Sequence, residues 1–134
     1  MTTIKQLIAD SEFAHSNLNI TDENFPIEKE PSIKGAVLEE YKAYTPVKDV
    51  LDDLKSRGRR PASAAELLMY SLENPKEMER YWLYALGQVV VIDGFECVLV
   101  LYVGGDGLSA GLYNIARGVG ACDSVLSFPQ ELPS

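Results

Sequence analysis

The sequence predicts an α+β fold, with three to four helices packed on one face of a mostly antiparallel C-terminal β-meander and one extra strand near residues 35–41. The middle of the chain holds capped segments whose apolar residues have helical spacing. Beyond residue 87 the chain changes to β-branched runs separated by glycine-rich turns. With 134 residues, of which 46% are hydrophobic, the chain has the size and composition of one domain, residues 1–134.

The N-terminal part of this domain, residues 1–32, is predicted to be a loop-rich segment with a short helix over about residues 3–10. Residues 33–87 are expected to be mainly helical and residues 88–134 to form the meander. The pattern of residues 35–41 fits both a strand and a helix, because a short apolar run does not define its own period. The helix start that follows at Pro46 favours the strand.

Three helices are predicted from their N-terminal residues. The first begins at Pro46, and the second begins at a capping box formed by Ser63 and Glu66. The third begins at Pro75 and ends at Gly87. Its apolar side is expected to carry Met78, Tyr81, Trp82, Ala85 and Leu86.

Turn residues divide the C-terminal part into strands. Asp93 and Gly94 are a strong hairpin signal between residues 88–92 and 95–103. Residues 104–107 form a second turn before a strand over residues 108–114, and Pro129 ends a last strand over residues 124–128.

Charge and cysteine content exclude several classes of protein. Twelve Lys and Arg residues against 20 Asp and Glu residues give a net charge of −8, which argues against nucleic acid as a partner. The one basic cluster, residues 55–60, is expected at a helix C-terminus, where it complements the macrodipole. Two cysteines do not build a disulfide framework, and neither a signal peptide nor a membrane-spanning segment is recognisable. We therefore expect a cytoplasmic protein without membrane contact.

A series of short motifs resembles a group of small uncharacterised bacterial proteins. The motifs are Arg-Pro-Ala-Ser at residues 60–63, Glu-Leu-Leu at residues 66–68 and Ala-Leu-Gly at residues 85–87, followed by C-terminal hairpins. In that group an Arg-Pro-Ala-Ser/Thr turn opens a Leu-rich helix. The resemblance covers residues 35–128; it supports the fold class and implies no activity.

Polar and aromatic residues of the C-terminal loops are the candidate ligand-binding residues. The loops at residues 104–107 and 117–122 are expected to form a site in which Arg117, Asp106 and Asp123 are polar anchors. Tyr102 and Tyr113 would supply its apolar walls. No catalytic residues are assigned, and one histidine with two cysteines does not provide a four-ligand zinc site, so neither a metal nor a cofactor is predicted.

Two functional hypotheses follow from these features. From residue 61 onward 3 basic residues stand against 9 acidic ones, a local charge of −6. The first hypothesis is therefore a non-catalytic module of the inhibitor, immunity or antitoxin type, which binds a basic protein through its acidic C-terminal sheet and loops. The alternative is a small-ligand-binding or enzymatic domain that uses the loop site. A homo-oligomer is a third prediction, in which residues 95–103 pair across an interface as an edge strand.

Overall fold

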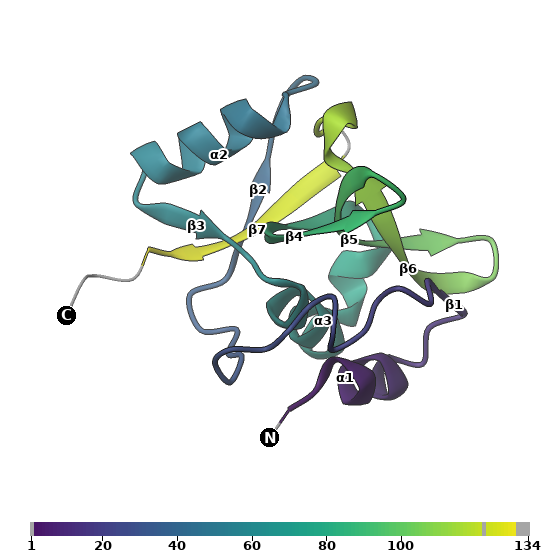
Figure 1. Cartoon of the computed structure of the whole chain (residues 1–134). Helices are drawn as coiled ribbons and strands as arrows, with labels where there is room; N and C mark the ends of the chain where they lie inside the picture. Colours follow the sequence, from purple (N-terminus) through teal and green to yellow (C-terminus); the bar gives the residue numbers. More distant parts are fainter. Residues whose placement is uncertain (1, 122, 131–134) are drawn as a thin grey trace.

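A computed structural model of the chain describes residues 2–121 and 123–130 (Figure 1). The α-helices are α1 (Ile4–Ser11), α2 (Val47–Ser56) and α3 (Ala64–Glu73), and the 3₁₀ helices are η1 (Pro75–Glu79) and η2 (Ile115–Arg117). The strands are β1 (His15–Ser16), β2 (Val37–Glu40), β3 (Arg59–Pro61), β4 (Trp82–Ile92), β5 (Phe95–Gly104), β6 (Gly107–Asn114) and β7 (Asp123–Pro129). Within the described ranges no helix is both long and apolar enough to cross a bilayer.

The strands form one mostly antiparallel sheet in the order β1-β6-β5-β4-β7-β2, with β3 also pairing with β7. The pairs β1/β6 and β4/β7 are parallel, and β4, β5 and β6 form a meander as predicted. The last predicted strand, β7, pairs with β4, β2 and β3 and not with β6, which corrects the prediction that it continues the meander. The α+β class is thus confirmed, as is the extra strand, which is β2. Strand β5 lies between β4 and β6, so the prediction that residues 95–103 form an edge strand is wrong.

Helices cover both faces of the sheet, which corrects the prediction that they pack on one face. Figure 1 shows α2 above the sheet and α1 and α3 beneath it. Leu83 of β4 belongs to the apolar core that includes residues of α1 and α3, whereas the adjacent Tyr84 belongs to the core formed with α2. Because successive strand residues point to opposite faces, the two cores lie on opposite sides of β4.

The predicted third helix is wrong. Only a 3₁₀ turn, η1, forms after Asn74, and the chain then enters β4 at Trp82. The next four residues, 83–86, are all buried, two on each face of the sheet. A strand that is buried on both faces has a continuous apolar run, and such a run also fits the spacing of a helix.

Residues 59–62, a short segment after α2 that was not predicted from the sequence, insert between β4 and β7. We call this segment the wedge. The Ala62 N–H donates to the Leu126 carbonyl at 2.9 Å, and the Gly87 N–H donates to the Ala62 carbonyl at 2.8 Å. Next to Gly87 the register of β4 against β5 shifts between Ala85 and Val90, which marks a large bulge. The wedge therefore fixes where β4 leaves β7 and continues into the β4–β5 hairpin.

Candidate functional site

The two loops predicted to form one site lie at opposite ends of β6. Asp106 is in the turn between β5 and β6, whereas Arg117 is at the end of η2, which follows β6. Strand β6 has 8 residues and therefore spans roughly 25 Å. Both side chains are exposed, and each belongs to a separate surface. Of the predicted loop residues, Cys122 lies outside the part of the chain that the structure describes.

Asp123 and Tyr113 do lie close together, around Tyr84. The Tyr84 hydroxyl donates to Asp123 Oδ2 at 3.0 Å, the Gly120 N–H donates to the same oxygen at 2.9 Å, and the Tyr113 hydroxyl donates to the Gly118 carbonyl at 2.8 Å. Burial and the charge of Asp123 raise the pKa of Tyr84, so this phenol remains a neutral donor. These bonds attach residues 118–120 to the sheet.

One cross-strand row of side chains, which we call the aromatic row, contains Asp123, Trp82, Tyr102, Ser109 and His15. Trp82 is the register partner of Asp123 on β7, and Ser109 on β6 is the partner of both Tyr102 and His15. The pairing of Leu83 with Leu101 places Trp82 beside Tyr102, where the two rings stack with centroids 4.4 Å apart and planes 16° apart. Register partners share a face, so the row runs across five strands on the α2 side of the sheet.

Trp82 is the residue of this row that sequence reasoning missed. In a helix it would belong to a buried apolar side, but as the first residue of β4 it is 44% exposed. The sequence signal that could have identified it is that Trp82 is the only tryptophan of the chain and directly precedes an apolar run, residues 83–86, which is buried in the structure.

A hydrogen bond between His15 and Asp106 lies at the far end of the aromatic row. His15 Nε2 lies 3.0 Å from Asp106 Oδ2, and both side chains are largely exposed. Asp106 therefore links β1 to the β5–β6 turn and does not join Asp123 at a common centre. Among the described residues no group of three or more His, Cys, Asp or Glu side chains is arranged to hold a metal ion.

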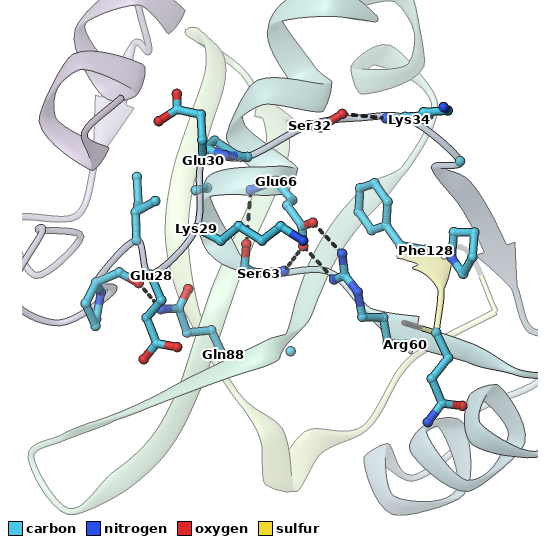
Figure 2. Close-up of a pocket in the computed structure, with 18 residues that line it drawn as sticks. Glu28, Lys29, Glu30, Ser32, Lys34, Arg60, Ser63, Glu66, Gln88 and Phe128 are labelled. Atoms are coloured by element: carbon cyan, nitrogen blue, oxygen red, sulfur yellow. Dashed lines mark hydrogen bonds and ion pairs between the residues drawn. The ribbon is translucent and has the colours of Figure 1, made fainter. Parts of the chain in front are cut away.

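A cleft of about 740 Å³ lies between the N-terminal loop and the wedge segment (Figure 2). Its lining comes from residues 26–32, 34 and 35, from the start of α3, from Gln88 and from residues 128–130. The Gln88 side chain accepts from the Ala64 N–H at 3.1 Å and donates to the Pro26 carbonyl at 2.9 Å. It thus holds the loop against the first turn of α3.

The centre of this cleft is a carboxylate with few remaining acceptor positions. Glu66 accepts two hydrogen bonds from Arg60, at 2.8 and 2.7 Å, and one from the Ser63 N–H at 2.9 Å, while Figure 2 shows Lys29 extending toward it. Burial alone would raise the pKa of Glu66, but the Arg60 and Ser63 hydrogen bonds lower it below its ordinary 4.5. Glu66 is therefore ionised at neutral pH, and its bonding suits an anchor better than a general base.

The basic cluster at residues 55–60 serves the fold more than the helix terminus. Arg57 pairs with Asp53 at 2.9 Å and Glu39 at 3.0 Å. Arg59 lies 3.7 Å from Glu39 and donates to the Ser127 hydroxyl at 3.1 Å. Together with the pair described above, each arginine of the cluster faces a carboxylate of the same chain.

The β4–β5 hairpin forms a second surface at the other end of β4 from the aromatic row. Val91 is 64% and Phe95 59% exposed, beside the exposed acidic residues Asp93 and Glu96. A groove of about 700 Å³ separates the hairpin from α2 and η2. The hairpin groove is lined by Pro46, Val47, Lys48, Leu51, Asp52, Gly94, Phe95, Glu96, Asn114, Ile115 and Ala116.

Comparisons with protein-family models, with curated proteins and with solved structures each found no match to this chain. The functional assignment therefore rests on the chemistry of the surfaces described above.

Proposed function

We propose that this protein is a non-catalytic module that binds a basic protein partner. The observation that carries the proposal is the β4–β5 hairpin, which exposes Val91 on the face it shares with Glu96 and Phe95 on the opposite face, with the exposed Asp93 in the turn between them. Exposed apolar side chains next to charged residues are typical of protein interaction sites.

Charge complementarity favours a basic segment as the occupant of the hairpin groove. Asp52 and Glu96 line the groove together with one basic residue, Lys48, whereas most of the other lining residues, which we call its floor, are apolar. Phe95 of the hairpin and Leu51 of α2 line the groove from opposite sides. An amphipathic segment with basic residues would bury its apolar side on this floor and place its charges beside the carboxylates.

The arginines of the basic cluster support the same reading. Because Arg57, Arg59 and Arg60 are paired with carboxylates of their own chain, they add little positive potential to the outer surface. The part of the chain from residue 61 onward, with its local charge of −6, supplies the hairpin and most of the sheet. An acidic surface of this kind accelerates association with a basic protein.

Affinity capture from a lysate of the source organism tests the proposal with matched variants. The double variant Val91→Ser and Phe95→Ser removes the apolar part of the hairpin surface, and Leu18→Ser, at a site that is 93% exposed, is the control. We expect a basic protein that is retained by the wild type and the control, is lost with the double variant, and elutes as ionic strength rises toward about 0.5 M. Equal retention by all three chains, or an acidic retained protein, would contradict the proposal.

A further inference from the structure

We propose that the aromatic row is a docking site for an arginine side chain of the partner protein, held between the indole of Trp82 and the carboxylate of Asp123. This inference rests on the proposed function for the nature of the partner. Its site is separate, because the row is at the first residue of β4 and the hairpin groove is at the other end of that strand.

The indole of Trp82 stacks on Tyr102 with one face, while the residue as a whole remains 44% exposed. The Tyr102 ring leans from β5 over β6, where a Cβ added at Gly111 would lie 3.5 Å from Tyr102 Cε1. Strand β7 lies on the opposite side of β4 from β5, and it carries Asp123 as the register partner of Trp82. The exposed tryptophan and a carboxylate are therefore on neighbouring strands, with the Cα atoms of Trp82 and Asp123 about 5 Å apart.

The carboxylate is already oriented by the protein. Asp123 Oδ2 accepts both the Tyr84 hydroxyl and the Gly120 N–H, so the side chain has a fixed position in the free protein. Ordering the Asp123 carboxylate therefore costs less free energy on ligand binding than ordering a mobile surface carboxylate would.

The chemistry of the row selects a guanidinium group. A planar cation stacks on an aromatic face and at the same time presents N–H donors in its plane to a carboxylate, whereas an ammonium does only one of these well. Trp82 is 44% exposed and lines neither of the two clefts described above, so the row is a shelf on the surface and not part of a cleft. Because sites for free small molecules are concave, an arginine of a protein, whose flanking residues add contacts, suits the shelf better than a free cation.

Because Trp82 is the only tryptophan of the chain, its fluorescence reports binding at this site. Trp82 emission is followed in the full chain while a capped pentapeptide with one central arginine is added, and the same peptide with citrulline or lysine serves as the matched ligand. Citrulline has the shape of arginine without its charge. We expect a saturable change with the arginine peptide, an affinity weaker by roughly two- to fivefold with lysine, and the weakest response with citrulline.

Two protein variants separate this site from a general charge effect. Asp123→Asn retains an oxygen for Tyr84 and Gly120 but removes the charge, and Asp106→Asn, near the far end of the row, makes the same change in net charge. We expect roughly tenfold weaker binding of the arginine peptide for the first variant and no change for the second. Tyr102→Phe should retain binding and Tyr102→Leu should weaken it, with circular dichroism confirming that both are folded.

The result is independent of the capture experiment. The double variant of the hairpin leaves the aromatic row intact, so its peptide titration should match the wild type. An equal response to arginine and citrulline, an equal loss in both Asn variants, or no saturable change would overturn the docking site and leave the hairpin proposal standing. A saturable, Asp123-dependent response without any captured partner would support the site and contradict the proposed function.

Discussion

Gly87→Ala tests the wedge that organises the sheet. A Cβ at this position would lie 2.5 Å from the Pro61 carbonyl oxygen and 2.6 Å from the Ala62 carbonyl oxygen. Both neighbours are backbone atoms, so no side-chain rotation relieves the clash. Ordinary van der Waals contact requires the wedge to move by about 0.7 Å. That movement acts on the hydrogen bonds from Gly87 to Ala62 and from Ala62 to Leu126.

The cost follows from these contacts. Overpacking contributes about 1–3 kcal/mol, and two weakened hydrogen bonds contribute about 1 kcal/mol each. We expect a loss of about 3–5 kcal/mol in the free energy of unfolding, which lowers the Tm of a chain of this length by roughly 10–20 °C. Urea denaturation followed by Trp82 fluorescence and circular dichroism measures both quantities.

A matched control exists in the turn between β5 and β6. Gly105 has no heavy atom within 4 Å of an added Cβ and does not have a positive φ. Gly105→Ala should therefore be neutral or slightly stabilising. If Gly87→Ala unfolds within about 0.5 kcal/mol of the wild type, the close approach of the wedge to β4 is refuted.

Three further predictions concern ionisable groups. Because the folded-state pKa of Glu66 is lowered, its ion pair with Arg60 stabilises the fold above about pH 4.5 and is lost as pH falls through the folded pKa. Glu66→Gln should reduce stability by about 1–3 kcal/mol at pH 7 and flatten the decline between about pH 5 and 3 in denaturation curves; an unchanged slope would contradict this. Burial raises the pKa of the Cys97 thiol, so peptide mapping after alkylation at pH 8 should find Cys97 unmodified in the folded chain and modified in urea. Tyr84→Phe should cost about 1 kcal/mol, measured by urea denaturation, because it removes a hydrogen bond to Asp123; no such loss is expected for Asp123→Asn, which keeps an acceptor there.

Local signals were sufficient where a segment's structure depends on its own residues. The capping box of Ser63 and Glu66 is present in the structure, with both reciprocal hydrogen bonds. The hairpin turn at Asp93 and Gly94 is also present, and both residues have the positive φ that such turns require. Each of these features is decided within a few residues of the chain.

The prediction of a helix from Pro75 to Gly87 was wrong for the opposite reason, because the structure of this segment depends on distant residues. Its helical spacing is real, but β4 is paired by β5 on one side and by β7 on the other. Burial on both faces of the sheet stabilises an apolar strand as well as a helix, and only the long-range pairing decides between them. Neither Leu101 nor Val125, the partners of Leu83 and Tyr84, is near them in the sequence.

The candidate sites depend on that same pairing. The helical reading places Trp82 on a buried side, whereas the strand reading aligns it with Asp123 and Tyr102, two residues that the sequence already marked as candidates. Their common row follows from strand register and from nothing in their spacing along the chain. Loop composition led instead to the prediction that Arg117 and Asp106 form one site. These residues are near each other in the sequence, but they lie at opposite ends of β6.

The placement of α2 explains why the two proposed surfaces are exposed. This helix packs on the middle of its side of the sheet, where Tyr84, Val98 and Val100 are buried beneath it. An α2 of 10 residues is about 15 Å long, whereas an 11-residue β4 extends over roughly 35 Å. The helix is therefore shorter than the strand, and Trp82 at the first residue of β4 and the hairpin at its last residue both remain exposed. The two surfaces lie at the two ends of β4, so a single partner that reaches both must be extended. In that case, the loss of affinity on joint mutation of Asp123 and Phe95 should equal the sum of the separate losses.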